Sequence, residues 1–465
     1  MKICESELHA SLARALEKYD VPGASAAVFQ GGEVTKAAAG VTNITTGVEL
    51  TPETVMHIGS ITKVFTATLV MQLVDRDQVD LDERVAHYLP ELKLGDKDAL
   101  KHITVKMLLN HTSGIDGDFM PDHGHDEETI EKAIQRYAAL GQLFHPGTEF
   151  SYCNAATVIA GYLVQRLTGT SWYRLVRERI LEPLSMQHAA VLPEEAILHR
   201  ASVGHYVDPH SRKAVRTSSA YLPLSVAPAG STLMMGAHEL LMFAEAHMAL
   251  GLGGNGARIL SARSAGVMQR LSVDNTGKGY TYVDGMGLGW MMSHDGLLQH
   301  SGGAPGACSV LYAHPSRRWA AAILTNSENG YRLIVDLMLP WLKELGAETP
   351  YGASSVEGPQ RDLEVVRENY VGVYEDIVIR YRVSLSQEGL QLSRQLKCKI
   401  YENVSMDAMK PVPLRAVGRN QFVLDADWKD SDLPPAFRTY TFRNPDSDGR
   451  MRHLGFGLRL YPRIA

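Results

Sequence analysis

Strand-like runs stand at both ends of roughly the first 345 residues, and a long, mainly helical stretch separates them. Near the N-terminus, Ala24–Gln30 and Glu33–Gly40 flank two glycines, which is a hairpin signal. Short apolar or alternating runs return at Gly287–Met292, Ala307–His314 and Trp319–Thr325. We therefore predict one antiparallel sheet that joins strands from both ends, with a helical subdomain inserted between them.

Two amphipathic segments are placed to flank this sheet. Residues 1–20 carry Leu8, Leu12, Ala15 and Leu16 at helical spacing, and Tyr331–Leu345 shows a similar pattern. Pro340 lies inside the second segment, so we expect a kink or a break there. The fold class predicted for this part is α+β, an antiparallel sheet flanked by helices.

The pattern changes after a loop rich in Gly, Ser and Pro at Thr349–Pro359. Strand-like runs then follow at intervals of about ten residues or somewhat more, namely Ile377–Ser384, Gly389–Leu392, Gln421–Ala426, Arg438–Phe442 and His453–Tyr461. This spacing is typical of a sandwich or barrel. We predict two domains, residues 1–348 and a β-rich domain over residues 349–465.

Composition and charge exclude several classes of function. The chain has 465 residues, a net charge of −6 and no block of Lys and Arg, which argues against binding to nucleic acid or an anionic membrane. No apolar run approaches the ~18 residues of a membrane span, and the N-terminus lacks the apolar core of a signal peptide. The four cysteines are scattered and are expected to be free thiols. We expect a soluble, cytoplasmic protein.

The segment His57-Ile58-Gly59-Ser60-Ile61-Thr62-Lys63 contains the only Ser-x-x-Lys in the chain. On a helix, residues i and i+3 share a face, so the Lys63 amine can reach Ser60 Oγ. A neutral amine activates a serine hydroxyl, and burial is one way to make it neutral. Taken alone, the same letters also describe an N-cap serine followed by an exposed lysine.

The second motif, Ser151-Tyr152-Cys153-Asn154, opens an apolar helix. Tyr152 can act as a proton shuttle, because its unperturbed pKa of ~10 is close to the ~10.4 of a lysine. Asn154 can donate a hydrogen bond to a substrate carbonyl or to Lys63. Tyr401-Glu402-Asn403 has the same Tyr-x-Asn spelling in the β-rich region and is assigned no role.

The third motif is His300-Ser301-Gly302-Gly303, just before the strand-like run at Ala307–His314. A glycine-rich edge allows close approach of a substrate backbone. The Gly303 N–H, together with the Ser60 N–H, is a candidate oxyanion hole. His300 and Gly302 are candidate substrate-binding residues.

The order Ser-x-x-Lys, Tyr-x-Asn, His-x-Gly resembles the serine β-lactamase family, with class C β-lactamases, D-aminopeptidases and β-lactamase-type carboxylesterases. The resemblance covers roughly residues 20–345 and includes the segment ending in His111-Thr112-Ser113-Gly114. Tyr370-Val371-Gly372-Val373-Tyr374 resembles the opening of the lipocalin-like barrels appended to some members. The resemblance implies a β-lactamase/transpeptidase-like fold with the site in the groove between sheet and helical subdomain.

The resemblance also implies a mechanism, in which Ser60 is acylated and Lys63 and Tyr152 move the protons. Where β-lactamases typically carry Lys-Thr-Gly, this chain has His300-Ser301-Gly302. A mostly neutral histidine is a weaker anchor for a substrate carboxylate than a lysine. We therefore predict a serine hydrolase of peptidase or esterase type, rather than an efficient β-lactamase.

Two alternatives remain open from the sequence. The same acyl-enzyme can pass its acyl group to an alcohol or amine, as an acyltransferase or transesterase does. A penicillin-binding sensor module would be acylated once without turnover. We expect a small-molecule or short peptide substrate, no cofactor, and possible assembly into a homo-oligomer. His123-Gly124-His125-Asp126 lacks a third ligand cluster at suitable spacing, so no metal site is predicted.

Overall fold

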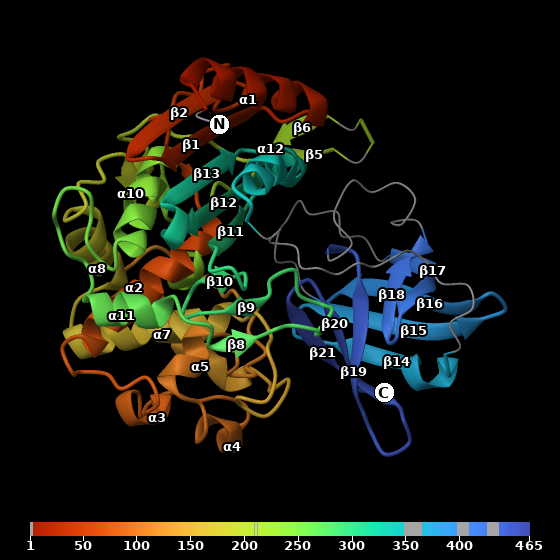
Figure 1. Cartoon of the computed structure of the whole chain (residues 1–465). Helices are drawn as coiled ribbons and strands as arrows, with labels where there is room; N and C mark the ends of the chain where they lie inside the picture. Colours follow the sequence, from red (N-terminus) through yellow and green to blue (C-terminus); the bar gives the residue numbers. More distant parts are fainter. Residues whose placement is uncertain (1–2, 209, 212, 348–364, 398–408, 426–436) are drawn as a thin grey trace.

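The computed structural model describes the whole chain except residues 1–2, 209, 212, 348–364, 398–408 and 426–436. Its described strands form two large antiparallel sheets in separate bodies, a mixed α/β body and a β-barrel beside it (Figure 1). The predicted fold class, α+β with a C-terminal barrel-like domain, is confirmed. The predicted boundary between residues 348 and 349, the loop Thr349–Pro359 and Tyr401-Glu402-Asn403 lie outside the described residues.

The first sheet joins strands from both ends of the first body, as predicted. β1 pairs with β2 on one side and with β13 on the other, where Ala24 lies opposite Thr325. The strand order is β2-β1-β13-β12-β11-β10-β9-β8. Their bounds are β1 Gly23–Gln30, β2 Glu33–Gly40, β8 Val273–Asp274, β9 Gly285–Met286, β10 Met291–Met292, β11 Leu298–Ala304, β12 Ala307–His314 and β13 Trp319–Thr325.

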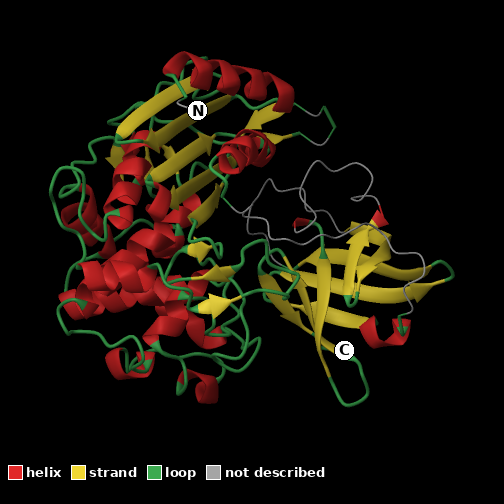
Figure 2. Ribbon diagram, in the orientation of Figure 1, coloured by secondary structure: helices red, strands yellow, loops and turns green. Residues whose placement is uncertain are grey.

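Helices cover both faces of this sheet (Figure 2). On one face, α1 (Glu5–Tyr19) and α12 (Gly330–Glu344) form an apolar core with the strands, and α1 buries the four residues predicted from its spacing. On the other face, α2 (Thr62–Val74) and α10 (Ala237–Met248) belong to a larger core. This larger core continues into the helical subdomain.

The helical subdomain lies between β2 and β8 in the chain. Its central contact is between α2 and α7, which pack directly on each other. α7 spans Asn154–Thr168, and the other helices are α3 Val85–Tyr88, α4 Lys97–Leu100, α5 Val105–Leu109, α6 Thr129–Arg136, α8 Trp172–Val176, α9 Pro193–Ala196 and α11 Ala262–Met268. Two small sheets join it, made of β3 Met56–His57, β7 Met234–Met235 and β4 Ala189–Ala190, and of β5 His205–Val207 and β6 Ala214–Arg216.

The C-terminal strands form a nearly closed barrel around a core rich in aromatic residues. The first and last strands meet through a bridge between Tyr374 and Arg463, and the Val373 N–H donates to the Ala465 carbonyl. The strands follow in chain order as β14 Gly372–Glu375, β15 Ile379–Ser386, β16 Gly389–Leu396, β17 Met409–Gly418, β18 Gln421–Leu424, β19 Tyr440–Pro445, β20 Met451–Phe456 and β21 Arg459–Pro462.

Three local predictions were wrong. Gly287–Met292 is not one strand, because Gly289 at φ 80° turns the chain between β9 and β10. His453–Tyr461 is two strands joined by a tight turn, with Gly457 and Leu458 both at positive φ. Pro340 does not break α12, which continues to Glu344, and it lies on the exposed face of the helix.

The described cysteines Cys4, Cys153 and Cys308 are free thiols, as predicted, and Cys398 lies outside the described residues. Among the helices of the described ranges, none has both the length and the apolar character that a membrane crossing requires.

Candidate active site

Ser60 lies in a 3-10 turn, Gly59–Ile61, that leads directly into α2. The α-helix therefore begins at Thr62, two residues after Ser60. Residues 62 to 73 are all buried, so α2 is surrounded by protein and is not apolar on one stripe only. Ser60 itself remains partly exposed at the end of this buried helix.

Glycines let three backbone segments meet around Ser60. Gly59 has φ 51°, and a Cβ there would lie 2.6 and 2.7 Å from the Gly303 O and N atoms. A Cβ on Gly230 would lie 2.8 Å from the Ser60 N atom. These approaches are too close for any side chain, so glycine is required at both positions. They bring the β11 backbone beside the nucleophile, as an oxyanion hole needs.

Lys63 is buried one turn from Ser60. Its Nζ lies 3.0 Å from Ser60 Oγ and donates a hydrogen bond to the Ala229 carbonyl at 2.6 Å. Burial holds the pKa of Lys63 well below its ordinary value, opposed by the negative charge of Asp118 and assisted by the positive charge of Arg459. A lysine of this kind can lose its proton and accept one from the serine hydroxyl.

Tyr152 lies beside the same amine, with the centre of its ring 4.8 Å from Lys63 Nζ. Burial raises the pKa of Tyr152 above its ordinary value, and a hydrogen bond with Ser60 only partly offsets this. The free side chains of lysine and tyrosine have similar pKa values. In the folded protein, the pKa values of Lys63 and Tyr152 are shifted apart. Burial therefore disfavours the charged form of both groups.

His111 supports the Tyr152 loop. Its Nδ1 accepts a hydrogen bond from the Cys153 N–H at 3.1 Å, and its carbonyl accepts one from the Ser151 N–H at 3.0 Å. Its ring lies 4.5 Å from that of Tyr152, centre to centre. Burial, together with the nearby charge of Lys63, lowers the pKa of His111, which keeps Nδ1 available as an acceptor.

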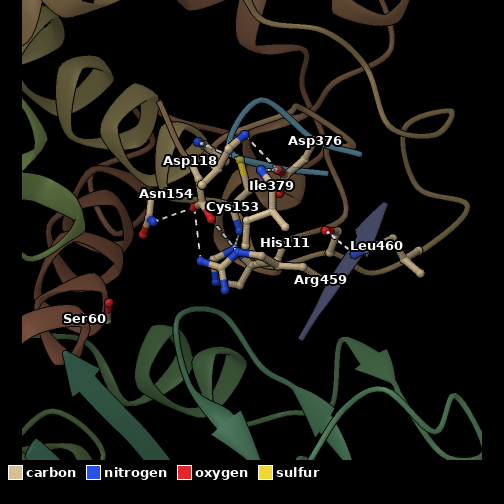
Figure 3. A network of polar contacts seen from close by, with 12 residues as sticks. Ser60, His111, Asp118, Cys153, Asn154, Asp376, Ile379, Arg459 and Leu460 are labelled. Atoms are coloured by element: carbon tan, nitrogen blue, oxygen red, sulfur yellow. Dashed lines mark hydrogen bonds and ion pairs between the residues drawn. The ribbon is translucent and has the colours of Figure 1, made fainter. Parts of the chain in front are cut away.

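Asn154 begins α7 and lines the same cavity as Ser60. Its Nδ2 donates a hydrogen bond to Asp118 Oδ1 at 2.7 Å (Figure 3). Within the described residues, no hydrogen bond joins Asn154 to Lys63. The sequence had suggested Lys63 or a substrate carbonyl as partner, so the direct contact to Lys63 is not formed.

His300-Ser301-Gly302-Gly303 lies in β11, where successive residues point to opposite faces of the sheet. Ser301 and Gly303 line the cavity, whereas His300 is buried and outside its lining. Burial lowers the pKa of His300 to about 3, so the ring is neutral, and its Nδ1 lies 2.7 Å from the Ser301 carbonyl oxygen. A Cβ on Gly302 would lie 2.0 Å from the Ile58 carbonyl oxygen, so glycine is needed here for β11 to pack closely against Ile58.

The C-terminal barrel contributes a charged residue to the site that the sequence did not reveal. Arg459, at the start of β21, forms a two-pronged ion pair with Asp118, at 2.5 Å (Nε–Oδ2) and 3.1 Å (Nη2–Oδ1) (Figure 3). Its guanidinium carbon lies 5.1 Å from the centre of the Tyr152 ring. Asp118 and Arg459 are 341 residues apart, so no local pattern joins them.

Two hydrogen bonds from backbone N–H groups join the barrel to the Tyr152 loop. The Tyr152 N–H donates to the Leu458 carbonyl at 2.9 Å, and the Leu460 N–H donates to Ser151 Oγ at 3.1 Å. The β20–β21 turn thus forms one wall of a cavity of about 340 Å³. Residues from both bodies line it, among them Ser60, Asp118, Met120, Tyr152, Asn154, Leu222, Val226, Met291, Ser301, Gly303, Ile379, Leu458 and Arg459.

The chain is similar to several known proteins in sequence and in fold. Penicillin-binding protein 4 of Amycolatopsis lactamdurans is 36% identical over 331 residues, 70% of this chain and 87% of that one. A D-aminopeptidase of Brucella anthropi is 34% identical over 188 residues, 39% of this chain and 35% of that one. The crystal structures of SurE, alone and with D-Leu, share 25% identity and cover 99% of both chains, with TM-scores of 0.77 and 0.75.

The family model described as "Beta-lactamase" matches residues 8–336, which contain the sheet, the helical subdomain and all three motifs. This chain belongs to the β-lactamase family.

Proposed function

We propose that the protein is a serine hydrolase that cleaves an amide or ester bond through an acyl-enzyme on Ser60. The observation that supports this most directly is the buried Lys63 amine, 3.0 Å from Ser60 Oγ and next to Tyr152. A buried amine with a lowered pKa is a general base for the serine hydroxyl. Such proton transfer typically contributes ~10²–10⁴-fold to a rate.

The proposed cycle has two halves. Ser60 Oγ attacks the substrate carbonyl carbon while its proton passes to Lys63 Nζ, and the oxyanion is held by the Ser60 and Gly303 N–H groups. The proton then moves through the Tyr152 hydroxyl to the leaving amine or alcohol, as the bond to the carbonyl carbon breaks. In the second half, water attacks the ester on Ser60 and gives its proton to the same pair, which regenerates the Ser60 hydroxyl.

The substrate class we propose is an amide or ester of a D-amino acid or of a short peptide containing one. The names of two similar proteins support this, a D-aminopeptidase and SurE with D-Leu bound. The neutral, buried His300 leaves its position in the motif without a fixed positive charge, which argues against efficient penicillin hydrolysis. A screen of D- and L-amino-acid amides, esters and a chromogenic cephalosporin tests this preference.

The Ser60→Ala variant tests the nucleophile. We expect it to lose turnover of a nitrophenyl ester entirely, while its thermal unfolding stays close to that of the parent, because Ser60 is partly exposed. Ser301→Ala is the matched control, since Ser301 lines the same cavity and is assigned no proton transfer. Undiminished turnover in Ser60→Ala would remove Ser60 from the mechanism.

Transfer of the acyl group to an amine or alcohol is the second candidate. The wall contributed by Leu458 and Arg459, with Met120, Leu222 and Val226, gives the cavity a partly apolar lining that favours an organic acceptor over bulk water. Product analysis with and without an added amine separates the two reactions. A new amide in proportion to amine concentration indicates transfer, and free acid alone indicates hydrolysis.

A further inference from the structure

A second cluster of reactive side chains lies at the start of α10 and shares no residue with the lining of the Ser60 cavity. His188, just before β4, meets His238 and Glu239, at the second and third positions of α10. Each offers a ligand atom, and the three atoms lie within 4.8 Å of one another. Fifty residues separate His188 from His238, so no short motif in the sequence points to the cluster.

Glu239 is the buried centre of this cluster, with 2% of its side chain exposed. Its Oε1 accepts the His188 N–H at 2.9 Å and lies 3.1 Å from His188 Nδ1 and 3.5 Å from His238 Nε2. The Glu239 carboxyl group therefore lies within contact distance of both imidazole rings.

The other carboxylate oxygen has no matching partners. Among the described residues, Glu239 Oε2 is buried without a hydrogen-bond partner, and so is His238 Nδ1. A buried carboxyl oxygen without a hydrogen-bond partner loses its hydration without compensation, which disfavours burial. The cluster therefore brings three possible ligand atoms together and has incomplete hydrogen bonding.

We propose that His188, His238 and Glu239 bind one divalent transition-metal ion of the zinc type. Two ligands held about 2.0–2.1 Å from a tetrahedral ion lie roughly 3.3 Å apart. The separations of 3.1 and 3.5 Å from Glu239 Oε1 to the two imidazole nitrogens match this spacing. Two imidazoles and a carboxylate suit Zn²⁺ and its neighbours better than Mg²⁺ or Ca²⁺.

The ion would stabilise the small sheet of β3, β7 and β4, which leads to Ser60. β7 lies between β4 and β3, and β3 leads into the Ser60 turn. The Gly236 N–H donates to the His188 carbonyl at 3.0 Å, so the segments that carry the ligands are already joined. Binding to the folded state alone stabilises it in proportion to the logarithm of metal concentration over Kd. We expect an effect on stability rather than on bond cleavage.

The test is metal binding by the full chain after treatment with a chelator and dialysis. We expect one equivalent of Zn²⁺ by elemental analysis, a visible d–d absorption with Co²⁺, and a rise in the unfolding temperature on adding Zn²⁺. His188→Gln and Glu239→Gln should each weaken Zn²⁺ binding at least 10-fold and abolish the Co²⁺ band. His188 is 38% exposed, so its variant should fold even where Glu239→Gln does not.

The double variant His123→Gln/His125→Gln is the matched control, because it also removes two histidines and leaves the proposed ligands intact. We expect it to bind Zn²⁺ like the parent. Absence of stoichiometric metal in the parent, or equal binding by parent and His188→Gln, would overturn the proposal. Neither result bears on Ser60, whose role is measured by ester turnover.

Discussion

At the residue scale, the site depends on burial acting in opposite directions on two pKa values. The pKa of Lys63 falls and that of Tyr152 rises, because burial disfavours the charged form of each group. The short-range part of this arrangement was predictable from sequence, since Ser60 and Lys63 are three residues apart in a helix. The hydrogen bond from Asn154 to Asp118 was not predictable from the sequence, because Asp118 lies in an irregular loop without a periodic pattern.

Lys63→Arg tests the role of the amine. A guanidinium stays protonated at any working pH and cannot accept the Ser60 proton, so we expect kcat/KM for an ester to fall by about 10²–10⁴-fold. In the parent, the rate should rise with pH as Lys63 loses its proton, and the variant should lack this rise. Lys101→Arg, at an exposed lysine, is the control. A variant with the parent rate and pH profile would exclude Lys63 as the base.

At the element scale, the β20–β21 turn makes the barrel part of the site. The sequence showed strand character over His453–Tyr461 but not the turn, because Leu458 adopts a left-handed backbone that leucine rarely takes. Through this turn, Arg459 pairs with Asp118 and the Leu458 carbonyl accepts a hydrogen bond from the Tyr152 N–H. The Tyr152 loop is therefore held by an element about 300 residues away in the chain.

Substitutions at the ion pair should move the pH profile in opposite directions. Asp118 raises the pKa of Lys63 and Arg459 lowers it. Asp118→Asn should therefore shift the rise in ester turnover to lower pH, and Arg459→Met should shift it to higher pH. Both variants should also be less stable, since each leaves one partly buried charge without its partner. Shifts in the same direction, or none, would show that this pair does not act on Lys63.

At the scale of the whole molecule, two carboxyl groups meet between the bodies. Burial, followed by the charge of Asp376, raises the pKa of Asp116 to about 7, and burial, followed by the charge of Asp118, raises that of Asp376 to about 6. The order of elements along the chain made both bodies predictable from sequence. Their contact was not, because it depends on single side chains from loops and strand ends rather than on periodic patterns.

This contact predicts a dependence of stability on pH. An unfolded aspartate has a pKa of ~3.9, so the two protonated groups contribute most to the free energy of unfolding below about pH 4. The contribution is lost as pH rises through the folded-state values of about 6 and 7. Asp116→Asn, which is neutral throughout, should raise the unfolding temperature more at about pH 8 than at about pH 5.

Calorimetry at the two pH values checks this prediction, with Asp82→Asn as the control at an exposed carboxylate. The Asp82→Asn variant should change the unfolding temperature little, and by the same amount at both pH values. A smaller stabilisation of Asp116→Asn at the higher pH than at the lower would contradict the assignment.

Intact-mass spectrometry of the full chain, quenched during turnover of an activated ester, measures the acyl-enzyme directly. We expect a transient mass increase equal to the acyl group, located by peptide mapping to Ser60 and lacking in Ser60→Ala. A permanent adduct without turnover would instead indicate the sensor role. An acyl group on another residue, or the same adduct in Ser60→Ala, would contradict the proposal that Ser60, Lys63 and Tyr152 form a catalytic site.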